Sequence, residues 1–585
     1  MAGDPTSPGP DPGAPSDPAR VPGVPVLDTS ATLPSGSGPP LPESAETFLH
    51  EYGVDAPRPR LILSLLSDGR WWSANDLVRA GGVAHSVVRS LLGALDESGE
   101  TDRDGDRYRL LRPGHYRGAT TAMLADPVAH LLNDHPRAAA ELVRAVAEGP
   151  ASDLDLDHVA ASAETALRRA LFLATRFELT GRTLVCVGDH DLTSVALSLV
   201  LPGARVEVVD LDERVLEHID AVAERLGLTI GTHSADLRLG LPQALRERAD
   251  VVFTDPPYTP DGVELFVRRG VEALVDPRKG RVLVAYGASE TTPKLAAAVQ
   301  TRLVRLGLLM EAVWPDFNRY LGAESIGAAS DLYVLRPLSK TLPFPDGESA
   351  RVYSQGVNAK EARGRSDAAR ALAVLERVAE DRGAEAEGSP ALVGDWPREV
   401  CREVRVRLST WMSSPTAVGT CAAIDLTGGW DRIAPRVALA TTADSAYMLV
   451  PSASSWVRDE VGQKAFRSMV EPGMRVRFLR GFGASDLTAI RLERNAEPGG
   501  SSGRLLAHVQ GRAHGTLTTT LRTGLVEVAA WREQAINKRT ARHAVASAPA
   551  WLPGHSLLDL PEHRFSALRA LTSELLARAE ELRSG

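Results

Sequence analysis

The residues best suited to chemistry are aspartates that directly follow apolar, strand-like runs. Ligands of open α/β sheets bind beyond the carboxyl ends of the strands, so these side chains are expected at one rim. One such aspartate alone is more often a helix cap than a catalytic group. Almost no cation accompanies the cluster, Arg238 being the nearest, so the carboxylates are expected to raise one another's pKa and to attract a cation. The seven residues are Asp189, Asp191, Asp210, Asp212, Asp236, Asp255 and Asp261.

Position along the sheet suggests roles in binding a nucleoside. Asp210, with Asp212 beside it, ends the second strand, where an acidic residue binds ribose hydroxyls in nucleotide-binding folds. Asp236 ends the third strand and can accept a hydrogen bond from an adenine amino group. Gly188 allows the backbone to approach the ligand closely. Its loop lacks the G-x-G-x-x-G pattern, which disfavours NAD or FAD and favours a nucleoside such as S-adenosylmethionine.

The tetrapeptide Asp255-Pro256-Pro257-Tyr258, followed by Thr259, is the strongest single signal. The prolines make the loop rigid, the carboxylate can accept from an amine, and the tyrosine ring offers a face to a cation. These features suit the attack of an amine on an electrophilic carbon next to a sulfonium. The tetrapeptide occurs in amino-methyltransferases, including those that act on adenine bases, so by itself it supports two classes of enzyme.

Alternating apolar and amphipathic segments between residues 160 and 338 predict the elements that position this rim. Strands and helices alternate, which indicates a parallel α/β sheet. Two further apolar runs, 308–314 and 331–337, need no helix between them and suit a closing antiparallel pair. The predicted strands span 183–187, 205–210, 229–236, 250–255 and 280–287, and the helices about 191–201, 213–226, 261–275 and 291–307. This is the layout of Rossmann-like S-adenosylmethionine enzymes.

The segments before this domain differ from it in composition. Residues 1–45 hold 12 of the 39 prolines and are predicted to be disordered, because they cannot bury enough apolar surface. Residues 46–115 predict three short helices and a hairpin with Asp104-Gly105 in its turn, which is a winged-helix pattern. The third helix offers Arg89 but little other basic character, so docking or dimerisation is favoured over DNA binding.

The α/β domain is expected over residues 116–340, and the remainder of the chain is less informative. Residues 341–395 are charged and rich in Ala, Gly and Glu, which predicts a linker or a partly helical connector. Residues 396–585 mix strand-like pieces with a helical end from 561 to 582 and predict an additional α+β domain. The sequence predicts no role for that domain.

Composition excludes several classes of protein. Lys+Arg minus Asp+Glu is 66 − 75 = −9, which argues against a nucleic-acid partner. Three cysteines are too few for a disulfide framework, and no run of eighteen apolar residues or secretory signal is found. A cytoplasmic protein without a membrane span is therefore expected. His190 has no second ligand at a suitable spacing, so no metal site is predicted; a monomer and a homodimer both remain open.

Three sequence runs resemble the bis(aminopropyl)spermidine synthases, the branched-chain polyamine synthases, over about residues 46–338. They are GDHDLTSVALSL, DPPYTPDGVELF and PDFNRYLGAESIGAASDLYVLRPL, and the winged-helix module ahead of them adds to the resemblance. The resemblance implies transfer of an aminopropyl group from decarboxylated S-adenosylmethionine, as a co-substrate, to a secondary amine of spermidine. The first 45 and the last 240 or so residues have no counterpart in that family.

The family motifs can be placed on this chain residue by residue. The Gly-Asp-Asp-Asp run falls on residues 188–191, and the resemblance implies that Asp191 orients or deprotonates the attacking amine. The Asp-Pro-Pro-Tyr-Thr run falls on residues 255–259 and lines the amine site. His190 replaces the middle acid of the family, which removes one negative charge. The residues expected to contact the amine are Asp189, His190, Pro256, Pro257, Tyr258, Thr259 and Asp261.

The leading hypothesis is a direct displacement at the rim. Asp210 and Asp236 hold the nucleoside, and Asp191 and Asp255 are the catalytic carboxylates. An amine of pKa about 10 must lose its proton, and a carboxylate of pKa about 3.9 is a poor base unless its pKa is raised. The neighbouring aspartates are expected to raise the pKa of Asp191.

Two other classes of function remain open. One is methylation of an amine or an adenine by intact S-adenosylmethionine. The nucleobase version needs a basic surface for the strand, which the acidic rim and the net charge disfavour. The other is a winged-helix regulator that senses a polyamine or nucleoside through a catalytically inactive α/β domain. His190 and the large C-terminal domain are compatible with it.

Overall fold

The computed structural model describes residues 40–119, 126–153, 156–287, 292–322, 327–338, 368–383, 388–400 and 404–584. The chain divides into two compact units, Met1–Ala125 and Asp126–Gly585, which are described separately. The tail predicted to be disordered lies outside the described residues as far as residue 39.

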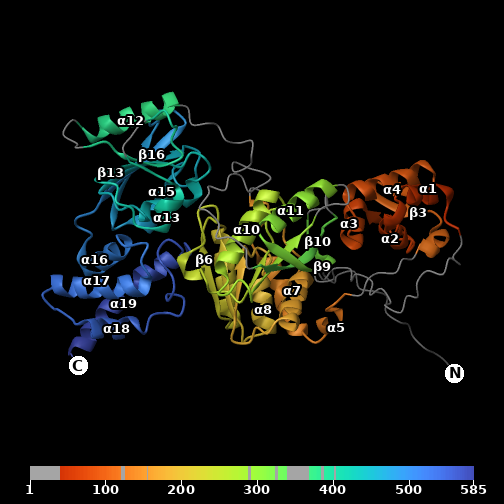
Figure 1. Cartoon of the computed structure of the whole chain (residues 1–585), viewed down its shortest axis with the longest axis horizontal. Helices are drawn as coiled ribbons and strands as arrows, with labels where there is room; N and C mark the ends of the chain where they lie inside the picture. The colour runs from red at the N-terminus through yellow and green to blue at the C-terminus, as the bar shows by residue number, and fades with distance from the viewer. Residues whose placement is uncertain are drawn as a thin grey trace, which may run out of the picture. The chain divides into compact units, whose positions relative to one another are not determined.

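The described part of the N-terminal unit combines helices with a small antiparallel sheet of order β1-β3-β2 (Figure 1). Its elements are α1 (Glu43–Glu51), η1 (Gly53–Asp55), α2 (Pro57–Leu66), β1 (Trp72–Ser73), α3 (Ala74–Gly81), α4 (His85–Glu97), β2 (Thr101–Asp104), β3 (Arg107–Leu110) and η2 (Pro113–Ala119). Helix α1 begins inside the predicted disordered tail because Phe48 and Leu49 are buried. The three predicted helices and the hairpin are confirmed, whereas the winged-helix assignment stays a prediction.

A mixed seven-stranded sheet forms the centre of the second unit (Figure 1). Its order is β6-β5-β4-β7-β8-β10-β9, in which β10 is antiparallel to both β8 and β9 and the other pairs are parallel. The strands are β4 (Thr183–Val187), β5 (Arg205–Asp210), β6 (Ile230–Ser234), β7 (Val251–Thr254), β8 (Arg281–Tyr286), β9 (Leu308–Arg319) and β10 (Ala329–Pro337). The five predicted strands and the closing pair are confirmed, and β9 continues past its predicted end to Arg319.

Helices cover both faces of this sheet (Figure 1). They are α5 (Ala129–Leu132), α6 (Pro136–Glu148), α7 (Ala163–Arg176), α8 (Thr193–Val200), α9 (Glu213–Leu226), η4 (Gln243–Leu245), α10 (Pro260–Ala273) and α11 (Pro293–Arg305). Helices α7, α8 and α9 pack on the face that contains Cys186, and α10 and α11 pack on the face that contains Val187. Both residues are fully buried, as continuous apolar runs in parallel strands require.

The C-terminal part of the second unit contains another mixed sheet, of order β12-β11-β13-β14-β16-β15. The elements are α12 (Ala368–Arg382), β11 (Ala391–Gly394), β12 (Arg405–Val406), α13 (Leu408–Ser413), β13 (Cys421–Asp425), η6 (Asp431–Ile433), α14 (Ala434–Leu439), β14 (Ser445–Pro451), α15 (Glu460–Val470), β15 (Met474–Arg480) and β16 (Leu487–Arg494). The segment 341–395, predicted as a linker or a partly helical connector, includes α12 and β11. Both belong to this domain, because Val374, Leu375 and Val378 of α12 pack into the core of its sheet. Residues 341–367 of it lie outside the described residues.

Four helices follow this sheet in the described part of the chain and pack against the rest of the unit. They are α16 (Gly500–Gln510), α17 (Leu517–Trp531), α18 (Lys538–Val545) and α19 (Arg564–Ser584). Helix α19 confirms the predicted helical end. At its start Arg564 forms an ion pair with Asp220 on α9, at 2.7 Å, and Arg436 of α14 pairs with Glu213 at the start of the same helix. The C-terminal domain therefore contacts the central sheet through α9.

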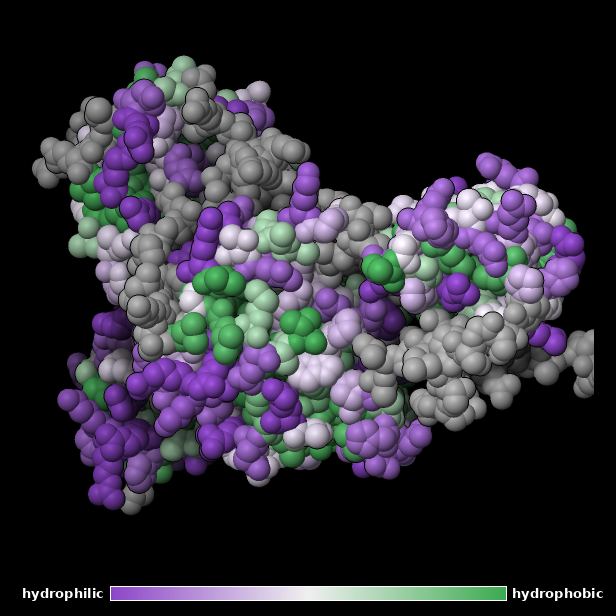
Figure 2. Space-filling view, turned by 45° about the vertical axis from the view of Figure 1, so that its right-hand side comes forward, coloured by the Kyte–Doolittle hydropathy of each residue, from purple (hydrophilic) through white to green (hydrophobic). Residues whose placement is uncertain are grey.

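No helix in the described residues is long and apolar enough to cross a membrane. Hydrophilic and hydrophobic residues are interspersed on the face of the molecule that Figure 2 shows.

Candidate active site

The carboxyl ends of β4, β5, β6 and β7 bring most of the predicted aspartates to one edge of the central sheet. Five of them are buried, namely Asp189, Asp191, Asp210, Asp212 and Asp236. Asp255 follows β7 and keeps 14% of its side chain exposed, so a ligand can reach it. Asp261, in the first turn of α10, is more exposed and lies 3.1 Å from Arg302.

A buried arginine on α7 joins the ends of β4 and β7. The Arg169 side chain is fully buried, and its guanidinium donates to Asp191 Oδ2 at 2.7 Å and to Asp255 Oδ2 at 2.6 Å. Its Nε donates to Asn318 Oδ1 at 2.7 Å, and the Phe253 ring centre lies 4.9 Å from the guanidinium carbon. The prediction that almost no cation accompanies the aspartates is therefore wrong, because α7 supplies one from a segment before the first strand.

Two tyrosines complete the surroundings of Asp255. The Tyr320 hydroxyl donates to Asp255 Oδ2 at 2.7 Å, and the Tyr258 hydroxyl lies 3.3 Å from Oδ1 and 2.8 Å from the Tyr320 hydroxyl. The Tyr320 hydroxyl is also 2.7 Å from Ser330 Oγ. Burial raises the pKa of both tyrosines, so their hydroxyls stay protonated and available as donors. The antiparallel pair β9–β10 thus supports the loop that carries Asp255.

The two bridged carboxyls differ in their affinity for a proton. Burial raises the pKa of Asp255 to about 8; the charge of Arg169 opposes this effect and the charge of Asp191 adds to it. Burial alone would raise the pKa of Asp191 too, but the charge of Arg169 outweighs it and lowers that pKa. Asp191 also accepts the Ala161 N–H at 2.7 Å. The prediction of a raised pKa at Asp191 is therefore wrong, whereas the roles of Asp191 and Asp255 as catalytic carboxylates stay predictions.

The structure brings Gly188 and Asp210 together at the ends of β4 and β5. The Asp210 carboxylate accepts the backbone N–H of Asp189 at 3.0 Å and that of Asp212 at 2.8 Å. Gly188 has a φ of 74°, a region in which glycine is favoured, and an added Cβ would lie 3.3 Å from the Phe266 ring. The arrangement agrees with the predicted nucleoside site, and the roles of these residues stay predictions.

Asp189 anchors the start of α8. Its carboxylate accepts the backbone N–H groups of Thr193 and Ser194 at 2.9 and 3.1 Å, as a helix cap does. Burial raises its pKa to about 7. Both oxygens of Asp189 are therefore already bound to the start of the helix. Its predicted contact with the amine stays a prediction.

Asp212 and Asp236 each have an arginine partner that the sequence did not reveal as such. Asp212 caps α9 and pairs with Arg214 at 2.6 Å. Asp236 is bound by Arg238 through Nη2 at 2.6 Å and Nε at 2.9 Å. Arg238 in turn lies 4.0 Å from the ring centre of Trp430, in the C-terminal domain. A nucleoside contact by either aspartate must therefore share the carboxylate with an arginine.

His190 is packed beside another histidine rather than exposed to the rim. Its ring stacks on His158 with centroids 4.6 Å apart, and its Nε2 lies 3.4 Å from Ser152 Oγ. Burial lowers the pKa of His190. The imidazole is therefore neutral at pH 7 and does not replace the negative charge of the family's acid.

The loop after β7 is fixed at both of its ends. Pro256 and Pro257 are buried, and Thr259 caps α10 by accepting the Gly262 N–H at 3.0 Å. The Tyr258 ring packs edge-on against Tyr286, with centroids 5.4 Å apart. These contacts agree with a rigid loop, and its rigidity stays a prediction.

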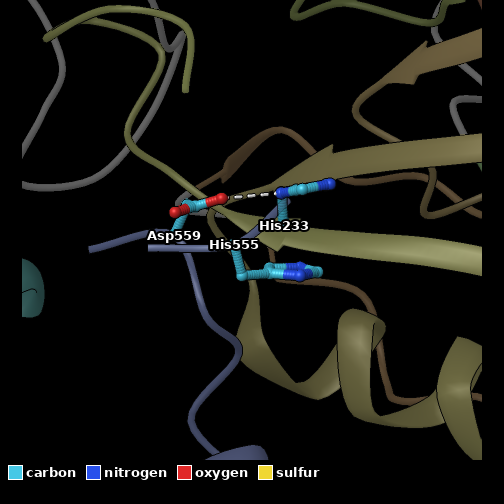
Figure 3. A group of neighbouring side chains, drawn as sticks. All are labelled: His233, His555 and Asp559. Carbon is cyan, nitrogen blue, oxygen red and sulfur yellow. Dashed lines mark hydrogen bonds and ion pairs between the residues drawn. The ribbon is translucent and has the colours of Figure 1, made fainter. Parts of the chain in front are cut away.

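A cluster of His233, His555 and Asp559, here called the clasp, joins β6 to the C-terminal domain (Figure 3). Its potential ligand atoms lie within 4.8 Å of one another. The two imidazoles are stacked, however, with centroids 4.2 Å and planes 15° apart. Imidazole binds a metal in the plane of its ring, so stacked rings cannot direct their lone pairs at one ion. His233 instead forms an ion pair with Asp559 at 2.7 Å.

Sequence reasoning missed three residues that contact Asp255 or its arginine. Arg169 lies in an amphipathic helix among apolar residues. That position was the one signal of a buried cation, and the adjacent Arg168 made it easy to overlook. Asn318 and Tyr320 lie in the PDFNRYLG run, which was noted for its resemblance but not for its side chains. Asn318 is fully buried, and its amide nitrogen donates to Ser330 Oγ at 3.0 Å.

Comparison with known proteins places part of this chain in a family. Residues 138–343 match the model of the branched-chain polyamine synthase A C-terminal domain, and this segment belongs to that domain family. The predicted family resemblance is thereby confirmed over the matched residues. Its expected extension toward residue 46 lies outside the match.

Individual relatives agree with this assignment. An uncharacterized protein of Methanocaldococcus jannaschii is 36% identical over 205 residues, which are 35% of this chain and 51% of that protein. The N(4)-bis(aminopropyl)spermidine synthase of Thermococcus kodakarensis is 30% identical over 173 residues, which are 29% of this chain and 49% of that protein. The chain thus spans about half the length of the curated relatives that it matches.

Solved structures of the same family are more distant. The branched-chain polyamine synthase from Thermus thermophilus, in complex with N4-aminopropylspermidine and 5'-methylthioadenosine, is 22% identical and has a TM-score of 0.40. The match covers 55% of this chain and 98% of that one.

Replacing Arg169 by Met is expected to lower the free energy of unfolding by about 3–5 kcal/mol, because it leaves two buried carboxylates without their cation. Urea unfolding measures the loss. Arg176→Met is the control, since Arg176 lies on the same helix with 36% exposure and one ion pair to Glu311, and its loss is expected below about 1 kcal/mol. Equal effects of the two substitutions would contradict the assigned role of Arg169.

The His233–Asp559 ion pair of the clasp is expected to stabilise the chain at neutral pH and to weaken in alkali. Burial would lower the pKa of His233, but hydrogen bonds to Asp559 and Glu207 outweigh it and raise the pKa to about 9. The stabilisation is complete below the unfolded-state pKa of about 6.5 and is lost as the pH rises through about 9, by about 3 kcal/mol at most.

Urea unfolding at pH 6.5 and 9.5 tests this expectation. In His233→Gln the pH-dependent loss should be smaller than in the unsubstituted chain. In the control His543→Gln, which changes an exposed residue, it should be unchanged. An equal loss in His233→Gln would show that the clasp does not titrate in this range.

Proposed function

We propose that the chain transfers an aminopropyl group from decarboxylated S-adenosylmethionine to an amine of a polyamine such as spermidine. The observation that carries the proposal is the match of residues 138–343 to the branched-chain polyamine synthase domain family, together with the partly exposed Asp255 that the fold brings to the rim of this domain. Relatives of about 30% identity that are named N(4)-bis(aminopropyl)spermidine synthases, from Thermococcus kodakarensis, Methanocaldococcus jannaschii and Thermus thermophilus, support the same reaction.

The donor nucleoside is proposed to bind across the ends of β4, β5 and β6. The Gly188 backbone can approach it closely, and Asp210 lies at the end of β5, where ribose hydroxyls are bound in such folds. Asp236, neutralised by Arg238, can still accept a hydrogen bond from the adenine amino group, because a carboxylate has about four lone-pair sites. The sulfonium then faces the acidic rim, which stabilises its positive charge.

The proposed displacement accounts for every bond and for the proton without a further reactant. The lone pair of the acceptor nitrogen attacks the methylene carbon bonded to sulfur, and a carbon–nitrogen bond forms as the carbon–sulfur bond breaks. The bonding pair remains on sulfur and yields 5'-methylthioadenosine. The proton of the acceptor amine passes to Asp255, whose raised pKa brings it nearer to that of an amine, about 10.

Asp191 takes a different role from the one first expected. Its oxygens accept from Arg169 and from the Ala161 N–H, and its lowered pKa keeps it ionised. It therefore fixes Arg169, and Arg169 fixes Asp255. Tyr258 donates near the same carboxylate and is proposed to line the amine path.

Methyl transfer from intact S-adenosylmethionine is the second candidate, because the Asp-Pro-Pro-Tyr loop suits both reactions. The two donors differ by one carboxylate, which intact S-adenosylmethionine carries on its aminoacid tail. Several carboxylates at the rim repel that group and attract the terminal ammonium of the decarboxylated donor. The acidic rim therefore favours aminopropyl transfer.

The N-terminal unit is proposed to be a winged-helix-like module for docking or for pairing with a second copy of this chain. On its hairpin, Arg107 pairs with Asp104 at 2.6 Å and Arg109 with Asp102 at 2.8 Å. These ion pairs neutralise cations that a DNA reader directs at phosphates, so DNA binding is disfavoured.

A donor-by-acceptor screen followed by mass spectrometry tests the proposed reaction. Purified chain is incubated with either decarboxylated or intact S-adenosylmethionine and with a panel of polyamines. We expect an aminopropyl increment on the polyamine only with the decarboxylated donor. A methyl increment with the intact donor would establish the second candidate, and donor binding without any product would point to the sensor function.

Replacing Asp255 by Asn is expected to lower kcat by about a hundredfold to ten-thousandfold, because the acceptor amine loses its base. In the unsubstituted chain kcat/KM should rise with pH through about 8, as Asp255 loses its proton. Asp250→Asn is the control, because Asp250 lies at the opposite end of β7 and binds Arg182 and the Thr183 N–H. Full activity of Asp255→Asn would contradict the assigned base.

A further inference from the structure

The C-terminal sheet repeats the strand order of the central sheet. Without β6, the central sheet has the order β5-β4-β7-β8-β10-β9. When these six strands are numbered by their place in the chain, the order across the sheet is 2-1-3-4-6-5. The C-terminal order β12-β11-β13-β14-β16-β15 has the same sequence of positions. In both sheets the first four strands across the sheet pair in parallel. The fifth strand across, β10 or β16, is antiparallel to both of its neighbours.

Three pairs of helices occupy matching places and faces, whereas α8, between the first and second strands, has no counterpart among the described residues between β11 and β12. Helices α7 and α12 each precede the first strand, α10 and α14 each connect the third and fourth strands, and α11 and α15 each connect the fourth and fifth. Helix α7 packs on the sheet face that contains Cys186 and Phe253, and α12 packs on the face that contains the matching Leu392 and Ala423. The later helices pack on the opposite face in both sheets.

The residues that leave the first strand also correspond. Gly188-Asp189 follows β4, and Gly394-Asp395 ends and follows β11, each glycine with a positive φ, of 74° and 93°. Gly394 lies opposite Asp425 in the register of β11 and β13. Continuing the register of β4 and β7 by two residues places Gly188 opposite Asp255 in the same way. Asp425 is therefore the counterpart of Asp255.

Within the described residues, the second sheet lacks the features of a nucleoside site. Trp396 stands where His190 stands in the first sheet; it is 5% exposed and its indole N–H donates to the Val393 and Ala423 carbonyls at 3.0 and 3.2 Å. Asp425 accepts from the N–H and hydroxyl of Thr427 at 2.9 and 2.7 Å. Strand β12 is the outer strand of the sheet and is followed by Arg407 rather than an acid. The ends of β11 and β13 are therefore closed by the chain itself.

The loop after β13 contacts the first sheet instead. Trp430, five residues after Asp425, is 6% exposed and packs its ring 4.0 Å from the guanidinium carbon of Arg238. The Gly429 carbonyl accepts from the same guanidinium at 3.3 Å. Arg238 is thereby held in its bidentate pair with Asp236 at the end of β6.

We propose that residues 368–494 are a second, closed copy of the fold of residues 163–337, and that its former active-site loop uses Trp430 to hold Arg238 on Asp236 at the donor end of the first copy. Trp430 is in this view a positioning residue for the nucleoside. This role rests on the proposed function, whereas the repetition of the fold does not.

Calorimetric titration of the full chain with 5'-methylthioadenosine tests the inference. We expect one nucleoside per chain. Trp430→Ala should weaken its binding about threefold to tenfold, because Arg238 loses its stacking partner and no longer holds the Asp236 carboxylate in the position that accepts from the adenine amino group. Trp430→Phe should restore most of the affinity, and Trp430→Leu, which keeps the apolar packing without a ring, should not. The KM for spermidine should be unchanged in all three variants.

Trp531→Ala is the control, because the Trp531 ring also stacks on an arginine, Arg504, at 4.0 Å, but is 51% exposed and lies on the helices of the C-terminal end. It should bind the nucleoside like the unsubstituted chain. Two nucleosides per chain would overturn the closed second copy. Unchanged affinity in Trp430→Leu would overturn the role of Trp430 and leave the proposed function standing. A lack of nucleoside binding by the unsubstituted chain would instead overturn the proposed function and the role built on it.

Discussion

The buried guanidinium of Arg169 is the contact on which the rest of the site depends. It joins the end of β4 to the end of β7 through Asp191 and Asp255, and it reaches β9 through Asn318. One positive charge cannot neutralise two carboxylates, and the buried interior does not solvate a second negative charge as water does. The carboxyl with more hydrogen bonds from the protein backbone stays ionised, and the one nearer the opening gains affinity for a proton. Asymmetry between two aspartates thus arises from one cation.

This asymmetry explains why an acidic rim suits amine chemistry. Carboxylates attract a sulfonium and a protonated amine, but ordinary carboxylates are too weakly basic to deprotonate the amine. Burial raises the pKa of Asp255, the hydrogen bond from Tyr320 opposes this rise, and 14% of the side chain stays exposed. The remaining aspartates are engaged by helix N-termini or arginines, so that they shape the rim rather than share its proton. In the proposed reaction, the same sheet edge holds both reactants and keeps one base among them.

The sequence predicted the sheet well because each strand is a continuous apolar run that ends in a polar turn, and every one of the five strands was found within about two residues. It predicted the site less well because side-chain partners come from distant segments. Arg169 precedes the first strand, and Tyr320 follows the sixth, so no local spacing connects them to Asp255. The strand-like pieces of residues 396–585 were predicted, but their order in a sheet was not, because β12 has two residues and α14 has six, which is too short for a periodic signal. Its likeness to the first sheet lies in strand order and register, which only the folded chain displays.

A crystal structure of the full chain with 5'-methylthioadenosine and spermidine would test the central claim most directly. The account predicts that the nucleoside lies at Gly188 and Asp210 and that a secondary amine nitrogen lies within hydrogen-bonding distance of Asp255, while Arg169 still bridges the two carboxylates. An amine held by Asp191 with Asp255 turned away, or a nucleoside bound at the second sheet, would contradict it.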